Sequence, residues 1–128
     1  MKILILEDQF IRIDYFKRVL STHELFITKD VNLAIDKLTS EKFDGLFVDN
    51  DLSDMKLQGT DFARMLFRKR QGLYFKFIII HSMNEPAANS IFDLLEEGLS
   101  KLIYKISFHQ LLKEREFKLL MENIERLP

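Results

Sequence analysis

The residues of this sequence that are able to do chemistry fall just after short apolar runs. Several of them are carboxylates, and the others carry an amide, an imidazole, a hydroxyl or an ammonium group. Their positions repeat one pattern, in which an apolar run of three or four residues is followed by polar ones. The residues are Glu7, Asp8, Asp49, Asn50, Asp51, His81, Ser82 and Lys105.

Residue types of this kind favour magnesium-assisted phosphoryl chemistry. Carboxylates held close together repel one another, and some of their pKa values rise unless a cation sits among them. An all-oxygen site in a chain without cysteine favours magnesium over zinc. An aspartate carboxylate is a nucleophile toward phosphorus. The ammonium group of Lys105 and the hydroxyl of Ser82 are suited to binding phosphoryl oxygens.

The elements that must position these residues alternate along the chain. Short apolar runs with β-branched or aromatic residues indicate strands that are buried on both faces. These runs are Ile3–Leu6, Leu25–Thr28, Leu46–Val48, Phe77–Ile80 and Leu102–Tyr104. Apolar residues recur at helical spacing between the runs, and Gly98 is well placed to end the fourth helix. The stretch from Leu111 to Ile124 indicates one final helix.

Alternating strands and helices predict an α/β fold, a doubly wound parallel sheet of five strands with helices on both faces. In such sheets ligands bind at the carboxyl ends of the strands. We therefore expect the polar residues that follow the strands to meet at one edge of the sheet.

Composition narrows the class of protein. The 128 residues suit one domain, and we expect residues 1–128 to form a single domain without an output domain. Nineteen basic and twenty acidic residues give a net charge of −1, which argues against a nucleic-acid or membrane-surface binder. No stretch approaches the roughly 20 apolar residues of a membrane span. The absence of cysteine excludes disulfides and cysteine nucleophiles, and a cytoplasmic protein is expected.

The pattern as a whole resembles the receiver domain of response regulators, the CheY-like family, along essentially the entire chain. The family's acidic pair after the first strand is matched by Glu7 and Asp8, and its phosphoacceptor by Asp49. The family's Ser/Thr after strand four is matched by Ser82, and its lysine after strand five by Lys105. The order and the strand-end positions of these residue types make the resemblance specific.

This resemblance implies the strand order 2-1-3-4-5 and a stand-alone module that accepts a phosphoryl group on Asp49. Magnesium would be bound by Glu7, Asp8 and Asp49, with the backbone carbonyl of Asp51 assisting. Ser82 and Lys105 would hold the phosphoryl group. The implied partners are a histidine kinase or phosphotransfer protein and a downstream protein, and a homodimer is left open. The implied role is signalling rather than that of a turnover enzyme.

The sequence also departs from the receiver pattern. Ser53 and Ile106 stand where receivers usually have proline. Leu102 stands at the position of the aromatic switch residue on the fifth strand. These departures favour an alternative, a pseudo-receiver that binds a partner without being phosphorylated.

A second resemblance gives a further alternative. Asp49-Asn50-Asp51-Leu52 and His81-Ser82-Met83-Asn84 resemble the divergent receiver-like proteins proposed to process cyclic phosphates, except that Asn50 replaces a histidine. Under that hypothesis His81 is a general acid or base. A buried, hydrogen-bonded role for His81 at the strand end is an equally good interpretation.

Two expectations concern structure alone. Asn84 is a good N-cap for the fourth helix, with Pro86 in the first turn. Most of the twelve phenylalanines belong in the core, and Phe10, Phe16 and Phe117 are candidates for exposed partner-binding residues.

Overall fold

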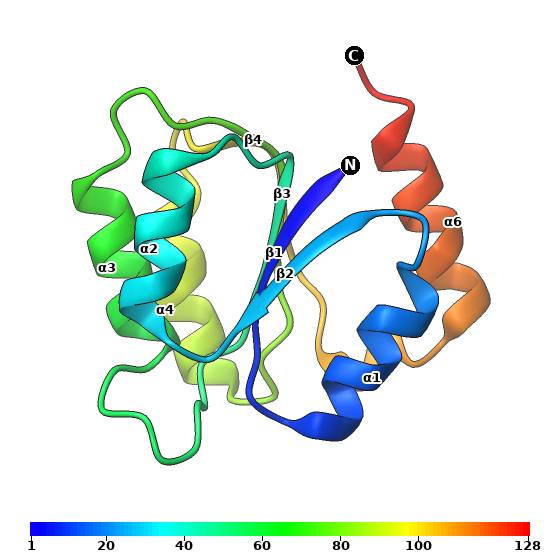
Figure 1. Ribbon diagram of the computed structural model, residues 1–128, viewed down its shortest axis with the longest axis horizontal. Helices are drawn as coiled ribbons and strands as arrows, with labels where there is room; N and C mark the ends of the chain where they lie inside the picture. The colour runs from blue at the N-terminus through cyan, green and yellow to red at the C-terminus, as the bar shows by residue number, and fades with distance from the viewer.

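Five strands form one parallel sheet in the computed structural model, which describes all 128 residues (Figure 1). Its strands are β1 (Lys2–Leu6), β2 (Glu24–Thr28), β3 (Gly45–Val48), β4 (Phe75–Ile80) and β5 (Ser100–Lys105). Their order is β2-β1-β3-β4-β5, and every neighbouring pair is parallel. The predicted doubly wound sheet and its strand order are thus confirmed.

The helices cover both faces of the sheet. They are α1 (Phe10–Val19), α2 (Val31–Ser40), α3 (Gly59–Arg68), α4 (Glu85–Leu95), α5 (Phe108–Leu111) and α6 (Glu114–Glu125). Figure 1 shows α2, α3 and α4 on one side of the sheet and α1 and α6 on the other. None of these helices has the length and apolar character needed to cross a bilayer.

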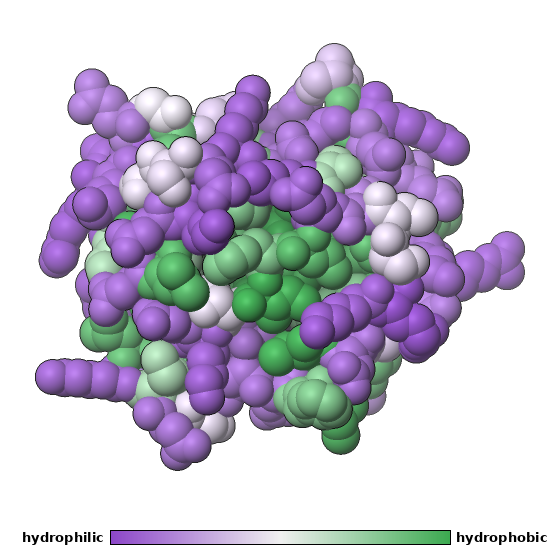
Figure 2. All heavy atoms as spheres, in the orientation of Figure 1, coloured by the Kyte–Doolittle hydropathy of each residue, from purple (hydrophilic) through white to green (hydrophobic).

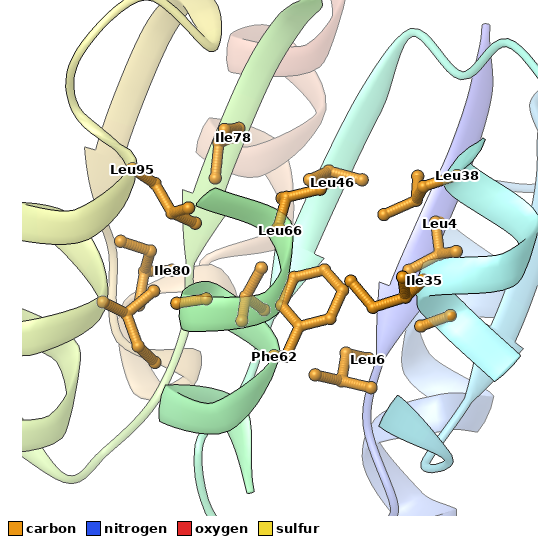
Figure 3. Close-up of a cluster of buried hydrophobic side chains, with 14 of the residues drawn as sticks. Leu4, Leu6, Ile35, Leu38, Leu46, Phe62, Leu66, Ile78, Ile80 and Leu95 are labelled. Atoms are coloured by element: carbon orange, nitrogen blue, oxygen red, sulfur yellow. The ribbon is translucent and has the colours of Figure 1, made fainter. Parts of the chain in front are cut away.

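The hydrophobic core has two halves, one under each helix layer. Successive residues of a strand point to opposite faces, so Leu4 and Leu6 of β1 join the half that contains α2, α3 and α4. Ile3 and Ile5 join the half that contains α1 and α6. Figure 3 shows the first half, where Phe62 of α3 lies among side chains from the sheet and the neighbouring helices. This packing fixes the positions of the strand ends.

The β2 edge of the sheet is open on its outer side. Figure 2 shows apolar side chains gathered in the middle of the face that β2 crosses. Leu25, Phe26 and Ile27 are half-buried there, whereas Glu24 and Lys29 beside them are exposed. Charged residues that flank an edge strand oppose edge-to-edge association.

The end of the chain differs from the expected single helix. A short helix, α5, is capped by Ser107, whose side chain accepts a hydrogen bond from the Gln110 backbone N–H. The chain leaves helical geometry at Lys113, where ψ is 80°, and α6 then starts. This break turns α6 so that Phe117 is buried while Leu119 is exposed.

The three phenylalanines named as candidates for exposed residues include one that is exposed. Phe16 and Phe117 lie in the core, and Phe10 alone is exposed. The N-cap prediction is confirmed, because the Asn84 side chain accepts a hydrogen bond from the Ala87 backbone N–H at 3.2 Å with Pro86 in the first turn.

Candidate functional site

The carboxyl edge of the sheet gathers the polar residues that follow the strands. The parallel register brings the last residues of β1, β3 and β4 level with one another. Glu7, Asp49 and His81 therefore follow these strands side by side. Lys105, the last residue of β5, is level with Ile80 of β4. The expected edge is present, although its residues do not all touch one another.

Glu7, Asp49 and His81 form the centre of the site. One ligand atom from each lies within 4.8 Å of the others, and all three side chains are buried, Asp49 at 2% exposure and His81 at 0%. His81 Nε2 lies 2.9 Å from Glu7 Oε1. Glu7 Oε2 accepts hydrogen bonds from the backbone N–H groups of Asp8 and Gln9. His81 is thus the partner of a buried carboxylate and does not face solvent.

Aromatic rings enclose His81 on the side away from the acidic residues. The ring centres of Phe16, Phe47 and Phe108 lie 5.3, 6.2 and 6.5 Å from the centre of the imidazole. His81 Nδ1 is buried there without a hydrogen-bond partner. The imidazole therefore has one direction in which to act, through Nε2 toward Glu7.

Arg12 of α1 belongs to this cluster, although the sequence analysis did not name it. Its Nη1 lies 3.6 Å from Glu7 Oε1 and 3.7 Å from Asp49 Oδ2. The guanidinium carbon lies 4.8 Å from the centre of the Phe108 ring. An arginine one helical turn past the acidic pair was the available signal, because the first turn of α1 begins at this same edge. Arg12 brings a permanent positive charge between the two buried carboxylates.

Burial and charge shift the pKa values of the two carboxyl groups in opposite directions. For Glu7, burial raises the pKa, but the hydrogen bond and charge of His81, the Gln9 N–H and the charge of Arg12 together lower it below its usual value. For Asp49, burial raises the pKa to about 6; the charges of His81 and Arg12 oppose this rise, and that of Glu7 adds to it. Of the two carboxyl groups, Asp49 is therefore the one whose ionised form is less stabilised by its surroundings, and a bound cation would stabilise it.

The two oxygens of Asp49 have different surroundings. Oδ1 accepts a hydrogen bond from the Asn50 backbone N–H at 2.8 Å. Oδ2 is the oxygen that faces Arg12. Oδ1 is thus held by its own loop, and Oδ2 is the atom available for chemistry.

The loop after β3 is fastened to the start of α3. The side-chain oxygen of Asn50 accepts a hydrogen bond from the Thr60 backbone N–H at 3.0 Å, and its amide donates to Asp51 Oδ1 at 2.8 Å. A Cβ at Gly59 would lie 2.1 Å from the carbonyl oxygen of Asp49. Asn50, which replaces a histidine of the cyclic-phosphate pattern, thus positions the backbone around Asp49.

The acidic residues fit a divalent cation. Asp8 Oδ2 accepts a hydrogen bond from the Ser53 backbone N–H at 2.8 Å, while Asp8 Oδ1 is buried without a partner. A buried carboxylate oxygen that lacks a partner needs a hydrogen-bond donor or a cation. Glu7 and Asp49 bring two carboxylates within 4.8 Å of each other, and magnesium is commonly held by one or two carboxylates together with water. The Asp51 side chain is engaged in the loop, where its Oδ1 accepts hydrogen bonds from the side-chain amides of Asn50 and Asn84.

Ser82 and Lys105 lie on the α4 side of this edge. Ser82 Oγ accepts a hydrogen bond from the Asn84 backbone N–H at 3.0 Å. Lys105 Nζ donates to Asn89 Oδ1 at 2.7 Å and lies 5.3 Å from the centre of the Phe92 ring. Both residues line a hollow of about 320 Å³ between α4 and the start of α5. The structure places Lys105 at the expected edge but bonds it to α4 rather than to Asp49.

Solved structures show the class of fold. The phosphorylated cyanobacterial phytochrome response regulator RcpA matches with a TM-score of 0.69 and 18% identity, over 98% of this chain and 94% of that one. The response regulator TrrA from Thermotoga maritima, in complex with Mg²⁺-BeF, matches with a TM-score of 0.61 and 19% identity, over 92% and 97%. A CheY-like receiver domain from Methanospirillum hungatei gives 0.60 and 19%, over 97% of both chains. The fold is that of CheY-like receiver domains.

The family follows from the sequence itself. Residues 2–97 match the family described as the cyclic-phosphate processing receiver domain. This match covers most of the chain and includes Glu7, Asp49 and His81, whereas Lys105 lies beyond it. The chain therefore belongs to this family of receiver domains. No curated protein matches the sequence.

Proposed function

We propose that this protein is a phosphoryl-accepting receiver module, with Asp49 as the acceptor and magnesium as the cofactor. One observation carries the proposal: a buried cluster at the carboxyl edge holds Asp49 by one oxygen and leaves the other, Oδ2, facing a cation. Glu7 beside it is kept ionised by His81 and two backbone N–H groups. This arrangement suits a fixed nucleophile next to a cation site.

The reaction is a direct displacement at phosphorus. Asp49 Oδ2 forms a bond to phosphorus while the bond to the donor's imidazole nitrogen breaks, and the imidazole leaves. With a pKa of about 6, Asp49 is largely ionised at neutral pH, as a nucleophile must be. Magnesium bound by Glu7, Asp8, Asp49 and the Asp51 carbonyl would offset charge on the phosphoryl oxygens. Ser82 would donate its hydroxyl hydrogen to the group from the β4 side, because its Oγ only accepts a hydrogen bond from the Asn84 backbone N–H.

The partners in this proposal are those of the receiver class. The donor is a histidine kinase or a phosphotransfer protein, and the output is another protein, all in the cytoplasm. The description of RcpA as phosphorylated and of TrrA as a complex with Mg²⁺-BeF supports phosphoryl and magnesium binding by this fold.

A small phosphodonor tests the proposal. The wild-type protein is incubated with acetyl phosphate and magnesium, and its intact mass is measured beside Asp49→Ala and Asp51→Ala. A phosphate-sized gain is expected in the wild type and in Asp51→Ala, which keeps its backbone carbonyl, and no gain in Asp49→Ala. A gain in Asp49→Ala, or none in the wild type, contradicts the proposal.

The second candidate function is the processing of cyclic phosphates. The buried Glu7–His81 pair within 4.8 Å of Asp49 favours it, and so does the family to which the chain belongs. Since His81 is fully buried, it would act by holding Glu7 as a general base and not by touching the substrate.

A panel of cyclic phosphates, including 2′,3′-cyclic nucleotides, tests this second function. Turnover by the wild type that is lost in His81→Asn and kept in His109→Asn, where the histidine is exposed, supports it. Absence of turnover with every member of the panel rejects it.

A further inference from the structure

We infer that Arg12, rather than Lys105, is the side chain that holds the phosphoryl group at Asp49. This inference rests on the proposed function, because it adds a residue to the same site. Both side chains carry a positive charge at the carboxyl edge, and the structure surrounds them very differently.

The guanidinium of Arg12 has its hydrogen-bond donors free. Its distances of 3.6 Å to Glu7 Oε1 and 3.7 Å to Asp49 Oδ2 are ion-pair distances, longer than a hydrogen bond. An arginine has five N–H donors in a rigid fork. The charge is thus in place beside both carboxylates, and the donors remain unused.

Packing fixes the direction in which these donors point. The guanidinium lies over the ring of Phe108, which is itself buried. The Arg12 side chain is only 17% exposed, so it is not a freely moving surface arginine. With the guanidinium held over this ring, its Nη1 lies 3.7 Å from Asp49 Oδ2, the Asp49 oxygen without a hydrogen bond.

A phosphoryl group formed on Oδ2 carries oxygens that the Arg12 fork matches. Guanidinium groups bind phosphate oxygens through two parallel N–H bonds, a geometry that an ammonium group does not have. The new oxygens are negative and lie near the buried carboxylate of Glu7. Arg12 stands beside both acidic residues and offsets that repulsion.

Lys105 is committed elsewhere. Its ammonium group donates to Asn89 at 2.7 Å and lies over the Phe92 ring, so both contacts bind it to α4. Reaching Asp49 would require the loss of both contacts. The side chain at position 102 is a leucine, so the aromatic switch residue of receivers is also missing on this strand.

Phosphorylation rates measured on four variants separate the two residues. The full-length protein is treated with acetyl phosphate and magnesium, and the rate of phosphate gain is followed by intact mass. Arg12→Gln is expected to lower the rate by about 100-fold, the usual cost of removing one charge-stabilising donor. Arg12→Lys recovers part of it. Lys105→Gln lowers the rate less than Arg12→Gln, and Arg18→Gln, an arginine on the same helix paired with Glu114, leaves it unchanged.

A second measurement, made on the wild-type protein, tests the inference even if Arg12→Gln does not fold. The Arg12 Nε–H resonance of the wild type is recorded by NMR before and after addition of magnesium and beryllofluoride, a phosphoryl mimic. A shift of this resonance supports the inference, and an unchanged resonance in a protein whose backbone spectrum responds overturns it.

The outcomes distinguish this inference from the proposed function. If Lys105→Gln loses as much rate as Arg12→Gln or more, the inference is wrong while Asp49 remains the acceptor. If the wild type neither gains phosphate nor responds to beryllofluoride, the proposed function fails and the inference falls with it.

Discussion

At the scale of single residues, the site depends on charge compensation in a buried space. Glu7 and Asp49 are almost entirely withdrawn from water. His81 Nε2 lies at hydrogen-bond distance from Glu7, 2.9 Å, and the Arg12 guanidinium lies 3.6 to 3.7 Å from both carboxylates. A buried charge that loses its partner is far more costly than a pair that is complete.

Replacement of His81 tests this compensation. His81→Leu keeps the apolar contacts with the surrounding phenylalanines but removes the Nε2 bond to Glu7. We expect the free energy of unfolding at neutral pH to fall by about 3 kcal/mol, measured by urea denaturation. His109→Leu, at an exposed position, is the control and should change little. A loss for His81→Leu no larger than that of the control would show that Glu7 does not depend on His81.

Asp49 gives the stability of the fold a pH dependence. Burial raises its pKa from 3.8 to about 6 in the folded protein. Between these values the folded state keeps a proton that the unfolded state has released, so the free energy of unfolding falls as the pH rises. The penalty is complete above pH 6 and absent below the unfolded pKa.

Asp49→Asn removes this penalty. We expect the variant to be more stable than the wild type at about pH 7.5, by as much as about 3 kcal/mol. The difference should shrink as the pH is lowered toward about 4. Thermal unfolding across this range, without magnesium, measures it. A stability difference that does not change with pH contradicts the raised pKa.

At the scale of elements, the start of α3 determines where Asp49 lies. The backbone N–H of Gly59 donates to the Asn50 carbonyl at 2.9 Å. A Cβ at this glycine would meet backbone atoms of Asp49 and Asn50, and backbone cannot turn aside as a flexible side chain does. The helix and the acceptor loop therefore form one rigid unit.

Gly59→Ala should displace that unit. We expect a loss of about 2 kcal/mol from overpacking and, with Asp49 moved, a slower gain of phosphate. Thr60→Ala, one residue further along the same helix turn, changes a side chain that makes no hydrogen bond and serves as the control. Urea denaturation and intact mass measure the two effects. Normal stability and phosphorylation in Gly59→Ala would show that the close approach is not required.

The strands and helices were predictable from sequence because their signals are local. Continuous apolar runs marked the strands, and the Asn84 cap with Pro86 marked the start of α4. The break at Lys113 was not predictable, because only the backbone angle of this residue separates α5 from α6, and the apolar pattern continues across it. The direction of α6 after this break decides that Phe117 faces the core, and the spacing of apolar residues in the sequence does not specify that direction.

The positions of the strand-end residues of the site were predictable from sequence, whereas the contacts of its long basic side chains were not. The parallel register alone places Glu7, Asp49 and His81 together. Arg12 reaches its partners only because Phe108, far along the chain, gives its guanidinium a surface. Lys105 turns toward Asn89 for the same kind of reason, a contact with another element. Flexible basic side chains go where tertiary packing offers them partners.

At the scale of the whole molecule, the fold separates its chemistry from its packing. The helix layers bury two apolar halves of the core, and the polar cluster lies at one edge of the sheet. Binding of a cation there stabilises the folded state alone, because the unfolded chain does not bring these carboxylates together.

Magnesium should therefore raise the melting temperature of the wild type at about pH 7.5. At a magnesium concentration of 100 times the dissociation constant, the free energy of unfolding should increase by about 2.7 kcal/mol. The increase should be smaller at about pH 5, where Asp49 is mostly protonated. Asp8→Asn should weaken it, and Asp14→Asn, at an exposed position of α1 outside the site, should not. An equal increase in wild type and Asp8→Asn would argue that the ion binds elsewhere.

The most direct test of the account locates the phosphoryl group in the chain. After treatment with acetyl phosphate and magnesium, borohydride reduction converts an acyl phosphate on aspartate into homoserine, and peptide mass analysis identifies the position. We expect homoserine at residue 49 and at no other acidic residue. Homoserine at Asp8 or Asp51 instead, or at no position in a protein that has gained phosphate, would contradict it.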